Sequence, residues 1–167
     1  STIDFGSIGN KFFENKLLNC KLYLEYGSGS STLLADRQNV NYYSIESDKS
    51  FYRTLKKSLK SKNYFLKDFG IVKEGSGPVL FSYRKFFLRK KVKKYANDIL
   101  QYLNEKNLIP DLILIDGRYR ILCALYVYKF LNVIKHLKIF KRAENHTLKF
   151  KRTKKTLNVY KFRINIL

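Results

Sequence analysis

An apolar run that ends in an acid and leads straight into a glycine turn constrains the fold of this chain more than any other feature. Residues 22–26 read Leu-Tyr-Leu-Glu-Tyr, and residues 27–32 read Gly-Ser-Gly-Ser-Ser-Thr. A short apolar run bounded by a turn signal is typical of a buried strand, and glycine permits the sharp turn that follows. The small polar residues then favour the start of a helix. We therefore expect a strand, a tight turn and a helix N-terminus in this order.

A second apolar run, residues 41–46, ends in Glu46. Strand, glycine turn, helix, strand and acid together are the layout of an α/β unit that binds a nucleoside. The helix N-terminus offers unpaired N–H donors and the positive end of the helix dipole. An acid at the tip of the second strand can accept hydrogen bonds from ribose hydroxyls. The alternative is a strand, turn and helix with a purely structural role.

The spacing of the small residues indicates which nucleoside fits. A dinucleotide fingerprint, G-x-G-x-x-G, would need a third glycine at position 32, where this chain has Thr32. The segment instead resembles the first motif of the class I, Rossmann-like S-adenosylmethionine-dependent methyltransferases, with a serine in place of the third glycine. The resemblance implies S-adenosylmethionine as the cofactor. The residues that it places at the cofactor are Glu25, Gly27, Ser28, Gly29, Ser31, Thr32, Glu46 at the ribose, and Asp68 beside the adenine.

A second segment, residues 110–120, is a buried-strand pattern that ends in Asp-Gly-Arg-Tyr-Arg. An acid at the carboxyl tip of a central parallel strand lies beside the crevice where open α/β sheets bind ligands. The phrase resembles the signature of a little-characterised methyltransferase-like family, and the whole resemblance spans roughly residues 20–131. The alternative is that Asp116 only caps the following helix.

The same segment supplies the candidate catalytic residues. Asp116 is the best candidate for a base that removes a proton from the methyl acceptor, or for a group that orients the acceptor. Arg118 and Arg120 could hold an anionic substrate, because a guanidinium pairs bidentately with carboxylate or phosphate. On one helix these two arginines do not share a face.

The chain carries a formal net charge of +21, from 34 Lys and Arg against 13 Asp and Glu. Such a charge normally implies a polyanionic partner. An A/T-rich genome is the alternative cause, because Lys, Asn, Ile, Phe and Tyr, which have A/T-rich codons, make up 77 of the 167 residues. The charge is densest at residues 84–94, the first half of an expected amphipathic helix. That half is a solvated face or a site for an acidic or phosphorylated substrate; a membrane-surface helix is less favoured, because the apolar face is needed for the core.

Alternating apolar and cationic residues at 136–142, 147–152 and 156–164 predict half-buried antiparallel strands. We therefore predict an α/β, Rossmann-like fold: a mostly parallel sheet with helices on both faces, ending in antiparallel strands. One methyltransferase-like domain would cover 1–167, with the cofactor-binding half at about 20–70 and the basic antiparallel strands at about 136–167. The expected helices are 8–18, 31–37, 49–60, 83–104 and 118–131, and the expected parallel strands are 21–26, 41–47, 64–67 and 112–116.

Two functions of different classes remain. One is an S-adenosylmethionine-dependent methyltransferase with an unknown acceptor; the other is a non-catalytic basic module that binds nucleic acid or another polyanion. An NAD-type dehydrogenase is disfavoured by Thr32 and by the lack of a plausible proton relay. The sequence has no apolar stretch of transmembrane length, no signal-peptide block in residues 1–16 and no Cys/His cluster with metal-site spacing. We expect a cytoplasmic protein, assign no residue to a metal, and leave open whether it depends on a metal and whether it forms a homo-oligomer.

Overall fold

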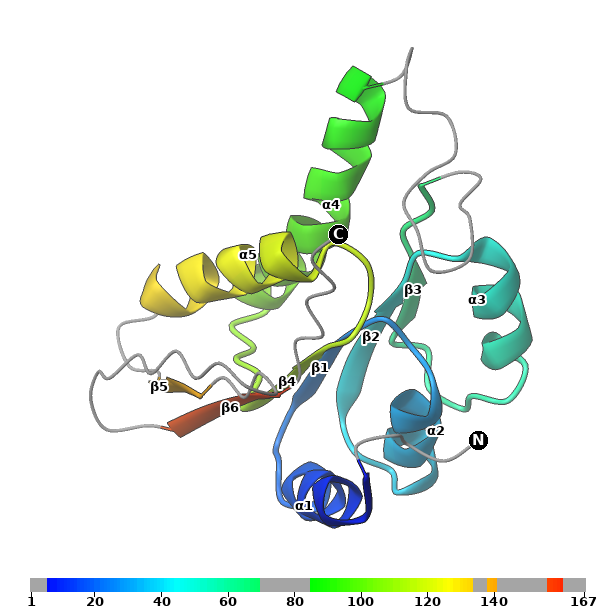
Figure 1. Cartoon of the computed structure of the whole chain (residues 1–167), viewed down its shortest axis with the longest axis vertical. Helices are drawn as coiled ribbons and strands as arrows, with labels where there is room; N and C mark the ends of the chain where they lie inside the picture. The colour runs from blue at the N-terminus through cyan, green and yellow to red at the C-terminus, as the bar shows by residue number, and fades with distance from the viewer. Residues whose placement is uncertain (1–5, 70–84, 134–137, 141–155, 161–167) are drawn as a thin grey trace.

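The computed structural model describes residues 6–69, 85–133, 138–140 and 156–160 (Figure 1). Its centre is a six-stranded sheet with the strand order β3-β2-β1-β4-β6-β5. All the strand pairs in this sheet are parallel. The strands are β1 (Tyr23–Tyr26), β2 (Tyr42–Glu46), β3 (Tyr64–Leu66), β4 (Leu112–Ile115), β5 (Lys138–Phe140) and β6 (Thr156–Tyr160).

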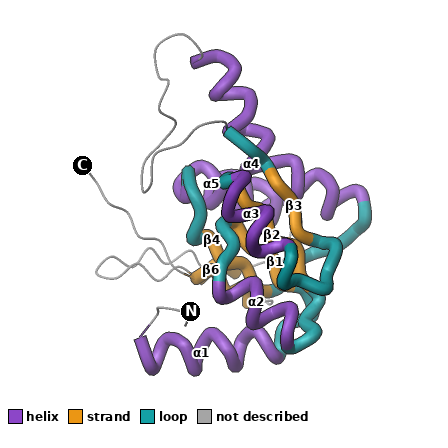
Figure 2. Tube along the Cα trace, turned by 90° about the vertical axis from the view of Figure 1, so that its right-hand side faces the viewer, coloured by secondary structure: helices purple, strands orange, loops and turns teal. Residues whose placement is uncertain are grey.

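Helices cover both faces of the sheet, as the alternation of strands and helices predicts. The helices α1 and α2 lie on one side of the strands, and α4 and α5 lie on the other (Figures 1 and 2). The helices of the described chain are α1 (Gly6–Leu18), α2 (Ser30–Arg37), α3 (Lys49–Lys56), α4 (Lys85–Glu105) and α5 (Arg120–Val133).

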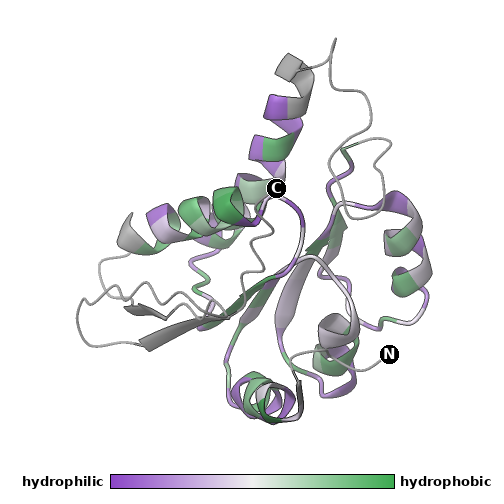
Figure 3. Ribbon diagram, viewed as in Figure 1, coloured by the Kyte–Doolittle hydropathy of each residue, from purple (hydrophilic) through white to green (hydrophobic). Residues whose placement is uncertain are grey.

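Two apolar clusters hold these layers together. The larger packs α4 and α5 on the sheet, with Leu24, Tyr95 and Ile113 fully buried. The smaller packs α1 and α2 on the opposite face through residues such as Phe13 and Leu17. Hydrophobic residues are concentrated on the central strands and on α5 (Figure 3). The strands β1, β2 and β4 are buried at every position, which is why their sequences are mostly apolar and do not alternate with exposed polar residues; the polar side chains in β1 and β2 are buried as well.

The prediction of an antiparallel ending was wrong. Strand β6 pairs with β4 in parallel, and β5 pairs with β6 in parallel. The alternation of apolar and cationic residues shows only that one face of a strand is exposed. Whether two strands pair in parallel or antiparallel depends on the segment of chain that connects them. Residues 141–155 between β5 and β6 are enough for a parallel crossover, which needs about a dozen residues. The strand expected at 147–152 lies outside the described residues, as does the end of the strand expected at 156–164.

Helix α3 ends at Lys56, earlier than the expected end at residue 60. The carboxylate of Asp36, at the end of α2, accepts hydrogen bonds from the backbone N–H groups of Lys60 and Ser61, both at 2.9 Å. Because the N–H groups of Lys60 and Ser61 donate to Asp36, they do not donate to carbonyl groups of α3, and the helix does not extend to residue 60. None of the helices in the described part of the chain is long and apolar enough to span a membrane.

Candidate functional site

Three turns lie side by side at the carboxyl edge of the sheet. Strand β1 is central, and its last residue, Tyr26, is level with Ile45 of β2 and Ile115 of β4. Backbone hydrogen bonds join the turns beyond this level: Gly27 N donates to Ile45 O at 2.9 Å. The N–H groups of Asp116 and Gly117 donate to Tyr26 O at 2.9 and 2.7 Å. The glycine turn, Glu46 and Asp116 are therefore brought together, as expected at the ligand crevice of such a sheet.

The turns after β1 and β4 approach so closely that both need glycine. Gly27 has a φ of +87°, and a Cβ atom added to it would lie 2.3 Å from the Cα atom of Gly117. A Cβ atom on Gly117 would lie 2.4 Å from the hydroxyl oxygen of Tyr95. That hydroxyl, which α4 contributes, is buried without a hydrogen-bond partner in the described structure. Gly27 therefore has two roles: it adopts the positive φ that its own turn needs, and it lets the turn after β4 pack closely against it.

Glu46 ties the glycine turn to β2. Its Oε2 atom accepts hydrogen bonds from the backbone N–H of Ser28 at 3.1 Å and from the Ser28 hydroxyl at 2.6 Å. Its Oε1 atom accepts from the backbone N–H groups of Ser47 and Asp48, at 2.6 and 2.8 Å. The residue is only 6% exposed. The carboxylate thus lies at the glycine turn, and both of its oxygens are hydrogen-bonded by the protein itself.

The Ser28 hydroxyl lies between two side chains that could contact a nucleoside. Besides Glu46, its Oγ atom hydrogen-bonds with the hydroxyl of Tyr64, at 2.8 Å. Burial raises the pKa of Tyr64, and the negative charge of Glu46 raises it further, so the phenol keeps its proton. Strand β3 therefore also contributes a hydroxyl to this edge of the sheet.

Glu25 lies on β1 and is fully buried. Its carboxylate accepts hydrogen bonds from Ser31 and from Thr32 at 2.5 Å, both in the first turn of α2, and from Ser44 of β2 at 3.1 Å. Burial raises the pKa of Glu25 to about 7, although the hydrogen bonds from these hydroxyls act in the opposite direction. Glu25 thus fixes the N-terminal turn of α2 against the sheet, and a ligand could interact with it only through the residues that cover it.

The two arginines of the Asp-Gly-Arg-Tyr-Arg segment point in different directions. Arg120 bends back onto its own turn: its Nη2 atom lies 3.1 Å from Asp116 Oδ1, and its Nε atom donates to Gly117 O at 3.1 Å. Arg118 extends across the edge of the sheet and donates from Nη1 to Ser47 Oγ at 2.9 Å. Since β1 lies between β4 and β2, Arg118 spans the carboxyl end of β1. The Asp116 side chain stays partly exposed.

The remaining predicted site residues lie at the same edge. Gly29 precedes α2 with an extended backbone, its N–H donates to Thr32 Oγ1 at 3.0 Å, and a Cβ atom added to it would meet only open space. Asp68 is half-buried in the chain just after β3.

Sequence reasoning missed three residues here. Ser47 follows Glu46 directly, so a search for hydroxyls next to the acid could have found it. Tyr64 was assigned to β3, but nothing in the sequence indicates that its hydroxyl reaches Ser28. Tyr95 reads as an ordinary apolar position of α4, and its contact with Gly117 follows only from the packing of α4 on the sheet.

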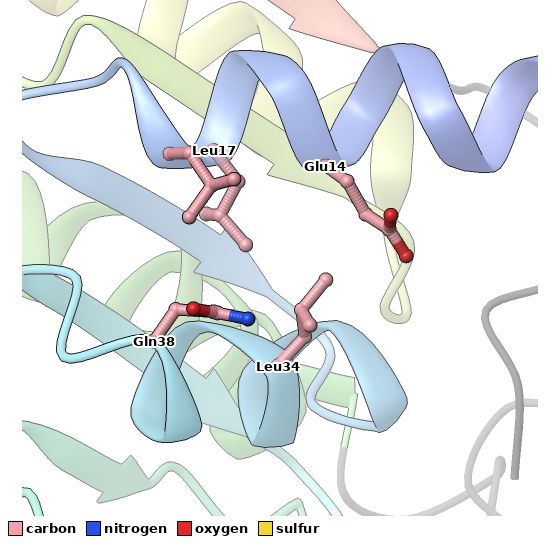
Figure 4. Close-up of a pocket in the computed structure, with 5 residues that line it drawn as sticks. Glu14, Leu17, Leu34 and Gln38 are labelled. Carbon is pink, nitrogen blue, oxygen red and sulfur yellow. The ribbon is translucent and has the colours of Figure 1, made fainter.

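A shallow hollow lies between α1 and α2, at the C-terminal half of α2 and so away from the glycine turn (Figure 4). Leucine side chains and the stems of two polar residues form its wall. The residues that line it are Glu14, Leu17, Leu18, Leu34 and Gln38. It does not contain any of the predicted site residues.

No family model matches the chain, and the comparison with curated proteins gives no match. Among solved structures, the fold is similar to that of a methyltransferase-like protein from Silicibacter pomeroyi, with a TM-score of 0.63 and 25% sequence identity. The match covers 75% of this chain and 66% of that protein, slightly less than two thirds of its length. The chain therefore has an α/β, Rossmann-like fold of the methyltransferase-like kind.

Proposed function

We propose that this chain is an S-adenosylmethionine-dependent methyltransferase. One observation carries the proposal: the Glu46 carboxylate is 3.1 Å from the backbone N–H of Ser28 in the glycine turn. An acid in hydrogen-bond contact with such a turn is the arrangement that an adenosyl ribose needs. The similarity to a methyltransferase-like protein at 25% identity supports the choice of cofactor.

The cofactor would lie across the turns after β1 and β2. The main chain of Gly27, Ser28 and Gly29 would pack against its amino-acid end, where Gly29 leaves open space. The ribose hydroxyls would bind Glu46 and take over the role of the Ser28 hydroxyl, which already donates to Oε2 at 2.6 Å. Asp68, beyond β3, would lie near the adenine. Bound in this way, the cofactor supplies an activated methyl group.

Glu25, Ser31 and Thr32 would act on the cofactor through position rather than contact. Their hydrogen bonds hold the first turn of α2 against β1. The N–H groups and the positive dipole end of that turn then face the crevice in a fixed orientation. The cofactor's ammonium group would not contact Glu25 directly; it would interact with it through the bridging hydroxyl of Ser31, which is 8% exposed.

The acceptor side of the crevice would be formed by the turn after β4. Methyl transfer mainly requires that donor and acceptor are aligned, with removal of a proton when the acceptor is a hydroxyl or an amine. Asp116 is exposed enough to accept that proton, and Arg120 fixes its orientation from 3.1 Å. Arg118, which spans the end of β1, would pair with an anionic part of the acceptor.

Isothermal calorimetry with S-adenosylmethionine and with NAD tests the proposal. The wild-type protein should bind S-adenosylmethionine and not NAD. Glu46→Ala should weaken that binding by a factor of about 10 to 100, because hydrogen bonds to a charged group contribute roughly 1.5–3 kcal/mol. Glu14→Ala removes an exposed acid on α1 and should leave binding unchanged. Binding of NAD alone, or equal effects of the two substitutions, would refute the proposal. Thermal melting of each variant would verify that it is folded.

A further inference from the structure

Helix α4 carries a continuous cationic surface in its first half. Five neighbouring cations there are exposed, while Val92, Tyr95 and Ala96 on the other side of the helix are buried. None of the five forms a salt bridge within the described part of the chain. We call this surface the basic face of α4; it consists of Arg89, Lys90, Lys91, Lys93 and Lys94.

Codon bias does not explain where these cations lie. All the cations of α4 fall in residues 85–94, whereas residues 95–105 contain no Lys or Arg and include Asp98 and Glu105. The second half also has exposed positions, among them Gln101 and Asn104. A drift toward A/T-rich codons would place lysine at exposed positions along the whole helix. The cations of α4 are therefore confined to its first half, which the average composition of the chain does not explain.

The cations also occupy positions that disfavour the helix. Arg89 and Lys93 are spaced i,i+4, as are Lys90 and Lys94, so like charges repel on one face. A negatively charged ligand would remove this repulsion, so ligand binding explains an arrangement that folding alone does not favour.

The position of α4 brings this surface to the proposed crevice. The Tyr95 hydroxyl lies against Gly117, so Tyr95 is at the level of the turn after β4. The basic face lies up to six residues before Tyr95, which is about 1.7 turns of helix. In that direction α4 extends away from the body of the sheet (Figure 1). The cations thus lie on the part of α4 that extends beyond the carboxyl edge of the sheet, on the helix that contacts the turn after β4.

From these observations we infer that the basic face of α4 binds the phosphate backbone of a nucleic acid. Its five cations, spread over successive turns, match a chain of repeated charges better than a single anion, which one or two cations would satisfy. A membrane surface fits less well, because an interfacial helix needs a free apolar face and that of α4 is buried in the core. That this nucleic acid is the methyl acceptor rests on the proposed function; the binding itself does not.

Fluorescence polarisation with labelled single-stranded RNA and DNA of mixed sequence, measured across a range of salt concentrations, tests this inference. If each of the five cations meets a phosphate, log K should fall against log salt concentration with a slope of about −3.5, at about 0.7 per phosphate on a single strand. The variant Lys90→Gln/Lys91→Gln/Lys94→Gln should lower the steepness of the slope by about 2. The RNA and DNA arms, compared at one salt concentration, identify which backbone binds more tightly.

The matched control is Lys49→Gln/Arg53→Gln/Lys57→Gln, which removes the same charge from exposed positions on or next to α3. It should leave the slope within about 0.5 of the wild-type value. Equal losses in the two triple variants would show that net charge alone drives binding and would overturn the inference. The inference would also be overturned if the protein did not bind nucleic acid at low salt, whether or not it bound anionic lipid vesicles in a parallel measurement.

Two further readouts distinguish the loss of phosphate contacts from damage to the fold. The α4 triple variant should melt at a higher temperature than the wild type, because its like charges are removed, while its nucleic-acid affinity falls. A variant damaged in structure would instead have both a lower melting temperature and a lower nucleic-acid affinity. The affinity of the α4 triple variant for S-adenosylmethionine should equal that of the wild type. Absence of cofactor binding in the wild type would refute the proposed function and leave the nucleic-acid result standing on its own.

Discussion

Gly27 and Gly117 are the two residues whose lack of a side chain sets the geometry of the site. Each occupies the space where the other would carry a Cβ atom, and Gly27 also has a positive φ of 87°. Gly29, two residues along the same turn, differs: it has an extended backbone and open space in the direction of its missing side chain. The two glycines of the Gly-x-Gly motif therefore have different physical roles.

Gly27→Ala should destabilise the fold by about 2 kcal/mol or more, since an alanine at positive φ is strained and its methyl group would collide with the backbone of Gly117. Gly29→Ala should cost about 1 kcal/mol or less, the difference between glycine and alanine at a helix N-cap. Urea denaturation of the two variants measures both values. Gly29→Ala should instead weaken S-adenosylmethionine binding, because its methyl group would enter the space left for the ligand. Equal stability losses would contradict these roles.

Glu25 gives the stability of the protein a predictable dependence on pH. Burial raises the pKa of its carboxyl to about 7 from 4.5, so the folded state binds the proton more tightly than the unfolded state. The stability linked to this proton is therefore fully present below pH 4.5 and is lost as pH rises to about 7.

Glu25→Gln keeps the shape of the side chain and removes its titration. Between about pH 5 and about pH 8 the free energy of unfolding of the wild type should fall by roughly 3 kcal/mol relative to that of the variant. Denaturation curves of both proteins across this range measure the difference. Parallel pH profiles would show that Glu25 ionises in the folded protein as it does in water.

At the scale of elements, Asp36 fastens the connection between α3 and β3 to the end of α2. Its carboxylate accepts hydrogen bonds from Lys60 N, Ser61 N and the Tyr42 hydroxyl, at 2.9, 2.9 and 3.0 Å. Although burial acts to raise the pKa of Asp36, these hydrogen bonds lower it overall. The stabilisation is therefore present at neutral pH and is lost as pH falls through the acid range.

Asp36→Ala should lower the free energy of unfolding by about 2–4 kcal/mol at neutral pH, because it leaves three donors without their charged acceptor. Asp48→Ala is the matched control: Asp48 caps α3 with one hydrogen bond, to Phe51 N at 2.8 Å. It should cost only about 1 kcal/mol. If the two variants were equally stable, the three hydrogen bonds to Asp36 would contribute no more to stability than the single capping hydrogen bond of Asp48.

Most of the elements could be predicted from local sequence, because each has a local cause. Strands β1, β2 and β4 are apolar runs followed by turn residues, and they were located to within two residues at either end. The end of α3 could not be predicted, since it depends on Asp36, which lies far from it in sequence. The direction of β5 and β6 could not be predicted either, because one-sided exposure does not distinguish parallel from antiparallel pairing.

Some residues of the candidate site could likewise be predicted from local sequence, and others could not. Its acids could be found because a carboxylate just after a strand marks the carboxyl edge of a sheet, and the parallel register then brings Glu46 and Asp116 to one level with Gly27. The hydroxyls of Tyr64 and Tyr95 reach the site from elements distant in sequence. Their distances to Ser28 and Gly117 depend on how β3 and α4 pack, which no local pattern encodes.

At the scale of the whole molecule, the fold places its proposed activities at one edge. The crevice turns follow β1, β2 and β4, the N-terminal turn of α2 faces them, and the first half of α4 extends beyond them (Figure 1). The large apolar cluster packs α4 and α5 against one side of the sheet next to this edge. A cofactor in the crevice and a polyanion on the basic face of α4 would therefore bind at the same edge of the sheet.

A crystal structure of the protein with S-adenosylhomocysteine would show whether Glu46 and the glycine turn bind the adenosyl group. We expect the ribose hydroxyls to lie within about 3 Å of the Glu46 carboxylate and to replace the Ser28 hydroxyl at Oε2, and we expect the glycine turn to pack against the amino-acid end of the ligand. An adenosyl group bound elsewhere, with the contact between Ser28 and Glu46 intact and the crevice filled by protein, would contradict this expectation.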